Sequence, residues 1–220
     1  MGVMSLLPLD PDQLLSTTRA VRKRLDFDRP VPRALIEECI QMAVQAPSGS
    51  NAQGWHFLVI EDQTKRTAIA DIYRRAFALY RDMPMAAGNI VTGSDERDAQ
   101  QQRVMDSAEY LAATMDKAPY MVIPCIEGRV DGTNNMIASS ILGSILPSAW
   151  SFMLAARARG LGTSWTTLHL MFEEEAAGVL GIPFAEFSQV CLTPVAYTRG
   201  TDFKAAAREP LTGILHWDSW

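Results

Sequence analysis

The chain has 220 residues, of which 48% are hydrophobic, and carries a formal net charge of −5. This length and apolar fraction are typical of one globular domain with a single large core. The acidic balance excludes nucleic acid as the main partner, because binding to a phosphate backbone depends on clustered cationic surface.

The N-terminal part of the chain is predicted to hold two helices and a strand. Apolar spacing favours a helix at 12–20 and a second one from Pro32 to just before Pro47. Residues 55–60 predict a strand, and apolar side chains on both of its faces indicate a central place in a sheet.

The middle of the chain is predicted to be helical on either side of an irregular segment. Helices are expected at 63–81 and 104–115, and the segment at about 83–103 shows no regular pattern. Long connections of this kind in a compact domain are usually lids or disordered. We therefore expect a candidate lid at 83–103.

The C-terminal half is predicted to contain strands at 120–126, 163–168 and 190–197, and helices at 138–159 and 173–180. The helix at 138–159 is mostly small or apolar, so deep burial is expected. Several helices interleaved with few strands indicate an α+β fold with a small mixed sheet.

The tail at 200–220 has little regular pattern but contains leucine, isoleucine and tryptophan residues. Apolar tails of this kind commonly pack on a partner subunit.

The cysteines and histidines give no sign of a metal site. Cys39, Cys125 and Cys191 are far apart in apolar surroundings, which indicates reduced core residues. The three histidines lack cysteine or carboxylate partners at metal-ligand spacing. With no targeting segment and no run of about 18 apolar residues, a cytoplasmic protein is expected.

A loop of small and polar residues at 46–55 is the most informative part of the chain. Ser48, Gly49 and Ser50 allow a close approach of the backbone, and Asn51 and Gln53 carry amides that both donate and accept hydrogen bonds. This mixture suits a planar heteroaromatic ligand. The same residue types are also ordinary turn formers, so a plain helix-to-strand turn explains the loop equally well.

Arg19 and Arg22 lie near the expected end of the first helix, where two cationic side chains can converge on one phosphate. A solvated basic helix end, favoured by the helix dipole, is the simpler interpretation. Arg208 in the tail has the same two interpretations.

Four blocks in this order resemble the FMN-dependent nitroreductase family and together cover nearly the whole chain. The blocks are 18–22, 46–55 and 155–163, followed by Lys204 with Arg208. The ending at 216–220 is similar to that of actinobacterial members. The resemblance implies a three-layer nitroreductase-like fold over 1–220 as a single domain, with a small mixed, mainly antiparallel sheet flanked by helices, in an intertwined homodimer.

The resemblance implies an FMN phosphate site at the first block. The family's Arg-Ser-x-Arg motif corresponds to Arg19, Ala20 and Arg22, so a hydroxyl donor is lost at Ala20. Lys204 and Arg208 are implied to bind the cofactor from the tail.

Two further segments are implied to surround the rest of the flavin. The loop contributes around the ribityl chain and the pyrimidine side through Pro47, Ser48, Gly49, Asn51 and Gln53. The strand after Gly162 is implied to lie against the ring, with backbone N–H groups near N5, at Trp165, Thr166 and Thr167.

The implied mechanism is a ping-pong hydride transfer from NADPH or NADH through FMN N5 to a nitroaromatic, quinone or similar electrophilic acceptor. No catalytic side chain and no metal is implied, because the flavin carries the chemistry. The family resemblance also implies an FMN cleft built from both subunits, with the 83–103 segment as substrate lid and no membrane partner.

Two alternatives stay open. The first is a flavin-dependent dehalogenase or flavin-fragmenting relative, which would need charged groups in the lid. The second is a non-catalytic flavin-storage protein, motivated by Ala20 and by Trp150, where polar residues are expected.

Overall fold

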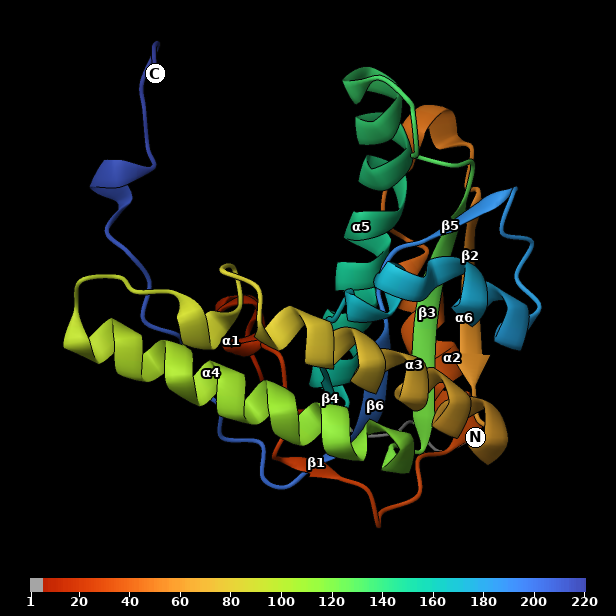
Figure 1. Ribbon diagram of the computed structural model, residues 1–220, viewed down its shortest axis with the longest axis horizontal. Coiled ribbons are helices and arrows are strands. Elements are labelled where there is room, and N and C mark those ends of the chain that lie inside the picture. The colour runs from red at the N-terminus through yellow and green to blue at the C-terminus, as the bar shows by residue number, and fades with distance from the viewer. Residues whose placement is uncertain (1–5) are drawn as a thin grey trace.

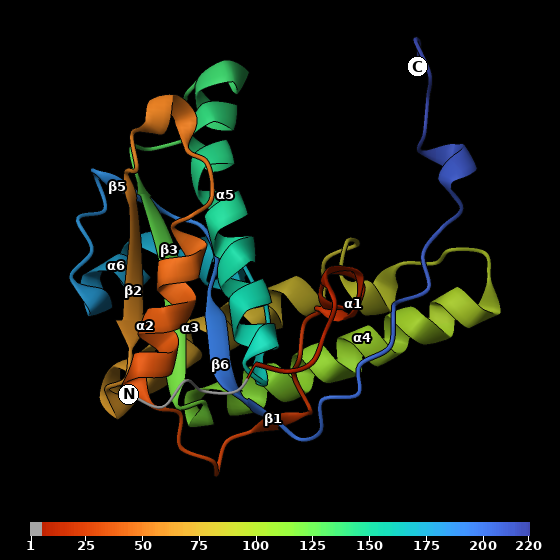
Figure 2. The same cartoon turned by 180° about the vertical axis from the view of Figure 1, so that it is seen from behind.

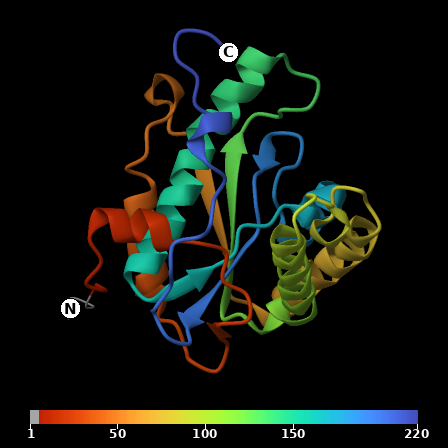
Figure 3. The same cartoon turned by 90° about the vertical axis from the view of Figure 1, so that its left-hand side faces the viewer.

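The computed structural model describes residues 6–220 as a three-layer α+β fold (Figure 1). Two helices cover one face of the sheet, α2 (Arg33–Ala43) and α5 (Asn135–Ala158). Three cover the other, α3 (Gln63–Arg81), α4 (Asp95–Thr114) and α6 (Glu173–Leu180). Figure 3 shows the sheet between these two helical layers. A short helix, α1 (Pro11–Thr17), contacts α5.

The sheet has six strands in the described part of the chain. They are β1 (Leu25–Asp26), β2 (Trp55–Ile60), β3 (Tyr120–Glu127), β4 (Leu161–Thr163), β5 (Phe187–Gln189) and β6 (Thr193–Thr198). The main path runs β1-β6-β3-β2, with β4 paired to β6 and β5 paired to β3, and every strand pair is antiparallel. Parallel pairing is confined to isolated bridges such as Ala20 with Thr163. The expected small, mainly antiparallel sheet is thus confirmed.

The position predicted for the strand at 55–60 is wrong: β2 is an edge strand, and β3 is central. Phe57 and Val59 pack on the cluster under α2 and α5, whereas Leu58 packs on the cluster under α3 and α6. The side chains of β2 are apolar on both faces because a helical layer covers each face. This pattern does not indicate whether a strand has one neighbour or two within the sheet.

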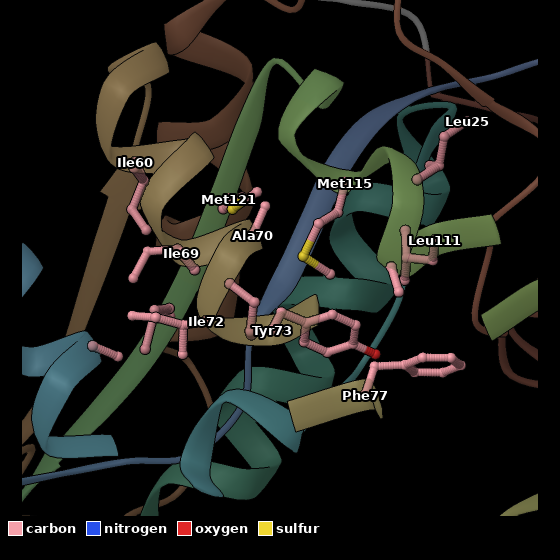
Figure 4. Packing of buried hydrophobic residues seen from close by; sticks show 14 of the residues in the cluster. Leu25, Ile60, Ile69, Ala70, Ile72, Tyr73, Phe77, Leu111, Met115 and Met121 are labelled. Atoms are coloured by element: carbon pink, nitrogen blue, oxygen red, sulfur yellow. The ribbon is translucent and has the colours of Figure 1, made fainter. Parts of the chain in front are cut away.

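The core is divided into two main clusters by the alternation of side chains along β3. Met121, Ile123 and Cys125 face the α3 side, and Tyr120 and Val122 face the α2 and α5 side. Figure 4 shows the first cluster, with residues of α3 packed over the sheet.

The three cysteines are buried and free, as expected. Burial raises the pKa of the thiols of Cys39, Cys125 and Cys191 to about 12. Such thiols stay protonated and unreactive near neutral pH.

Several element boundaries differ from the prediction. Helix α4 begins at Asp95, so the second half of the segment expected to be irregular is helical. Its buried residues are few and begin at Met105, which leaves its first turns without an apolar face that a pattern could detect. The expected strand at 163–168 is wrong because β4 ends at Thr163, and Thr166 forms only an isolated bridge with Leu192. The short strands β1 and β5 were not expected.

Helix α5 is less buried than expected. Its inner face includes Ile145, Ala149 and Phe152, but Leu146 and Trp150 are exposed on the outer face. Contrary to expectation, α5 is also long and apolar enough to cross a membrane, by length and composition alone. Serine residues interrupt its apolar residues, yet a window of 18 residues within it has a mean hydropathy of 1.5. The core helix of a globular protein passes the same test, so this is weak evidence for a membrane segment.

The tail after β6 leaves the body of the molecule and runs past α1 and α4 (Figures 1 and 2). Its apolar side chains are exposed, with Trp217 at 80% and Trp220 at 102% of full accessibility.

Candidate functional site

The arginine segment, residues 19–24, lies between α1 and β1 and includes a turn at 22–24. It does not lie at a helix end as expected, because α1 ends at Thr17. Val21 donates its N–H to the Thr163 carbonyl at 2.7 Å, which fixes the segment beside β4. This approach needs a glycine at 162, because a Cβ there would lie 2.7 Å from the Thr198 methyl group. Gly160, at φ +76°, ends α5 just before β4. Gly160 thus lets the chain turn from α5 into β4, and Gly162 lets the arginine segment pack closely beside that strand.

The arginine segment lines a cationic cavity of about 280 Å³. Its lining residues are Arg19, Ala20, Val21, Arg22, Lys23, Arg24, Ser107 and Phe203. The lining contains four cationic side chains and no carboxylate. A cavity with this balance of charge favours an anionic ligand.

The guanidinium of Arg19 has no partner within the described chain. Its Nε and Nη2 atoms are buried and make no hydrogen bond. A buried N–H group without an acceptor costs about 1–3 kcal/mol and more when it is charged. An oxyanion in the cavity would satisfy these groups, so the residues present fit a phosphate.

Arg22 is held against α4 and near the aromatic residues of α3. Its Nη1 donates to the Ser107 hydroxyl at 3.0 Å. Burial lowers the pKa of Arg22, and the neighbouring Tyr73 and Tyr80 partly oppose that effect. A partly desolvated guanidinium binds an anion more strongly than one in water, because the local dielectric is lower.

The segment after β4 lies beside this cavity. Thr166 donates its hydroxyl to Tyr73 at 2.9 Å, and the Tyr73 ring lies close enough to Arg22 to interact with its charge. The Thr166 N–H donates to the Leu192 carbonyl at 3.1 Å, so this amide is engaged within the sheet. Trp165 is partly buried against the α2 and α5 side, and Thr167 is exposed.

The 47–53 loop has a strained backbone. Ser50, Asn51 and Gln53 have φ of 52°, 54° and 55°. This conformation costs about 1–3 kcal/mol at residues other than glycine and is concentrated at functional sites. Such strain favours a ligand loop over a plain turn.

Hydrogen bonds hold the loop in place. Gly49 donates its N–H to the Ser144 hydroxyl of α5 at 2.9 Å, and Gln53 donates its N–H to the Ser48 hydroxyl at 3.1 Å. The Gln53 side chain donates to the Asn51 side chain at 3.1 Å. Pro47, Asn51 and Gln53 are exposed.

The loop and the arginine segment lie at different levels of α5. The loop contacts Ser144, whereas Arg157 near the end of α5 contacts Thr17, just before the arginine segment. At about 1.5 Å per residue, the two positions are about 20 Å apart along the helix. Figure 2 shows the loop before β2 near the upper end of α5 and the segment leading to β1 near its lower end. One protomer therefore does not bring the two groups of predicted residues together.

Lys204 and Arg208, the two site residues predicted in the tail, lie close in sequence to Phe203, and both are exposed. Lys204 follows Phe203, which is part of the cavity wall. Arg208 does not line the cavity, and the neighbouring Glu209 forms an ion pair with Arg97 of α4.

Sequence reasoning missed three residues at this site: Ser107, Tyr73 and Phe203. Ser107 and Phe203 line the cavity, and Tyr73 accepts the hydrogen bond of Thr166 beside it; all three come from segments distant in sequence from the arginine segment. Only Phe203 carried a usable signal, its position beside Lys204 in the last of the four blocks.

Comparisons with known proteins agree with this architecture. Residues 15–197 match the model of the nitroreductase family. A protein of Archaeoglobus fulgidus named as an NADH dehydrogenase/NAD(P)H nitroreductase is 25% identical over 173 residues, which cover 78% of this chain and 76% of that protein.

Two solved structures show the same fold. One is an iodotyrosine deiodinase bound to FMN and 3-iodo-L-tyrosine, with a TM-score of 0.69, 19% identity, and 94% of this chain and 98% of that chain covered. The other is an FMN-dependent nitroreductase from Mycobacterium smegmatis in complex with NADPH, with a TM-score of 0.66, 21% identity, and 94% and 97% covered. With the family match over most of its length, this chain belongs to the nitroreductase family.

Proposed function

We propose that this protein is an FMN-dependent oxidoreductase that takes electrons from NAD(P)H and passes them to a small electrophilic acceptor such as a nitroaromatic or a quinone. The observation that carries the proposal is the partly buried Arg19 in a cationic cavity, whose Nε and Nη2 atoms are buried without a hydrogen-bond partner. Family membership supports it. When bound, FMN would supply the hydride chemistry at its N5 atom.

The chain's own residues bind and orient the cofactor in this proposal. Arg19 and Arg22 would hold the phosphate by charge-assisted hydrogen bonds, which are about twice as strong as neutral ones. The hydrogen bonds of Thr166 to Tyr73 and Leu192 would fix the segment after β4 as a wall for the ring. Because the Thr166 amide is engaged, a backbone donor to the ring would come from Trp165 or Thr167.

A second copy of the chain would complete the site. The strained loop at 47–53 is distant from Arg19 within one protomer, so it would meet the flavin of the other protomer. The exposed positions on α5 offer the contact surface, because Met136, Gly143, Leu146 and Trp150 recur at helical spacing on one side. The small residue Gly143 in this stripe would let two helices approach closely. The apolar tail would pack on the same partner.

The dehalogenase alternative has less support. The likeness to the deiodinase is a likeness of fold at 19% identity. The connection between α3 and α4 presents apolar side chains to solvent, including Met85 at 70% and Val91 at 84% exposure. An adaptable apolar wall suits aromatic acceptors better than a zwitterionic substrate. We further propose a cytoplasmic location, which membership of this family supports.

Reconstitution with FMN tests the proposal. We expect the purified protein to take up FMN and retain it through desalting, and the Arg22→Ala variant to bind at least about tenfold more weakly, as loss of a charge-assisted hydrogen bond implies. Arg29→Ala is a matched control, because Arg29 is exposed, stacks on Tyr197 and does not line the cavity. Failure to bind FMN would refute the function, and full retention by Arg22→Ala would refute the phosphate assignment.

A further inference from the structure

Arg157, in the last turn of α5, is a buried cation without a counter-ion. Only 4% of its surface is exposed, and within the described residues it forms no ion pair. Its Nη2 donates to the Thr201 carbonyl at 2.9 Å and to the Thr17 hydroxyl at 3.3 Å. Its Nε and Nη1 are buried without a partner.

Two nearby arginines, Arg24 and Arg159, have the carboxylate partner that Arg157 lacks. Arg24 pairs with Asp202 at 2.7 Å, and Arg159, which caps the C-terminal end of α5, pairs with Glu38 at 3.2 Å. Within the part of the chain that the structure describes, Arg157 and Arg19 are the arginines with buried, unpartnered N–H groups.

Arg157 and the cavity share a wall. Phe203 lines the cavity, and the guanidinium groups of Arg24 and Arg157 lie 4.1 Å and 4.8 Å from the centre of its ring. Arg157 is also close enough to Arg24 and Arg19 to be repelled by them, and this repulsion adds to burial in lowering the pKa of Arg157. An arginine stays protonated in a protein, so the charge remains.

A buried charge without a counter-ion is strongly unfavourable. This is why removing one partner of a buried ion pair destabilises a protein so much. The arrangement of Arg19 and Arg157 therefore calls for an anion that the described chain does not provide. Ala20 offers no side-chain donor to such an anion, so the anion makes one hydrogen bond fewer. A nearby buried positive charge would offset that lost hydrogen bond.

We propose that Arg157 is a positioning residue of the phosphate site, which holds Phe203 and the start of the tail against the cavity and stabilises the bound phosphate through its buried charge. The inference rests on the proposed function, because the phosphate concerned is that of FMN. Arg157 does not line the cavity, so its effect acts across Phe203 and over a short distance in a medium of low dielectric. Thr201 and Thr17 fix the guanidinium in this position.

A comparison of FMN with riboflavin separates this role from a purely structural one, because riboflavin lacks the phosphate. We expect Arg157→Met to weaken FMN binding by about tenfold or more and to leave riboflavin binding unchanged, both measured by quenching of flavin fluorescence. Arg157→Lys should recover most of the loss because it keeps the charge. Arg159→Met, on the same helix end but with its own carboxylate partner, should change neither affinity.

Thermal unfolding provides the second readout. Since Arg157→Met removes an unpaired buried charge, the variant without flavin should melt at the same temperature as the unmodified protein or higher, while the stabilisation by added FMN falls. If Arg157→Met does not fold, Arg157→Gln removes the charge and keeps a donor for Thr201, with the same expected loss of FMN affinity.

Equal weakening of FMN and riboflavin binding in the Arg157 variants would show that Arg157 only clamps the tail and does not stabilise the phosphate through its charge. That result would overturn the inference, as would unchanged FMN affinity. An unmodified protein that binds neither flavin would instead refute the proposed function. The two failures are therefore distinguishable.

Discussion

His169 shows how burial sets the charge of a single residue in this molecule. It is fully buried, and within the described residues neither ring nitrogen has a hydrogen-bond partner. Desolvation lowers its pKa to about 3, far below the usual value of about 6.5 for an exposed imidazole. The neutral form is therefore the native one, and unfolding at mildly acidic pH takes up a proton.

This protonation predicts a loss of stability in acid. Between the unfolded and folded pKa values the unfolded state binds more protons, so stability falls as pH decreases below about 6.5. From pH 7 to 5 the contribution of His169 amounts to about 2 kcal/mol. Urea unfolding at several pH values should show this decrease, and His169→Leu should flatten it by that amount. His216→Gln, in the exposed tail, should leave the decrease unchanged. Identical pH profiles for His169→Leu and the unmodified protein would contradict the account.

Single residues were predictable from sequence where the signal was local. Gly160, which has a φ of +76° just after α5, is a local signal for the end of a helix. Arg19 was found as a candidate anion ligand, although in the wrong local structure. Ser107 and Arg157 were not identified, because their roles depend on contacts between segments that are distant in sequence.

The elements differ in how well a pattern identifies them. Helices α3 and α6 match the prediction at both ends, since amphipathic spacing and breakers mark them. The start of α4 was missed because no residue before Met105 in that helix is buried. The strand β2 was placed wrongly because burial on two faces does not reveal an edge.

The exposed stripe of α5 leads to a prediction about assembly. Trp150 and Leu146 are about one-third exposed in the single chain, so an aspartate at either position would place a charge in a closely packed helix interface. We expect Leu146→Asp to convert a dimer to a monomer and to lose FMN, as measured by light scattering and flavin content. Leu79→Asp is the matched control, because Leu79 is also exposed but lies on α3, across the sheet. A Leu146→Asp variant that stays dimeric with full flavin would exclude this surface.

At the scale of the whole molecule, the candidate site is divided. The arginine segment, β4 and the start of the tail form one part, and the strained loop forms another about 20 Å along α5. Both parts were predicted from the sequence, and the resemblance implied a cleft built from two subunits. The order of the motifs did not tell which of them lie together in one chain, because that depends on the folded structure. In the proposed dimer, the exposed tail and the exposed residues of α5 would contact a second copy of the chain, whose loop would complete the site beside the arginine segment.

The rate of flavin reduction tests the central claim most directly. With FMN bound, mixing with excess NADPH or NADH in a stopped-flow instrument should bleach the absorbance at about 450 nm much faster than for free FMN. Adding a nitroaromatic or a quinone should then restore that absorbance. Bound FMN that is reduced no faster than free FMN by either nicotinamide would contradict an oxidoreductase and favour flavin storage.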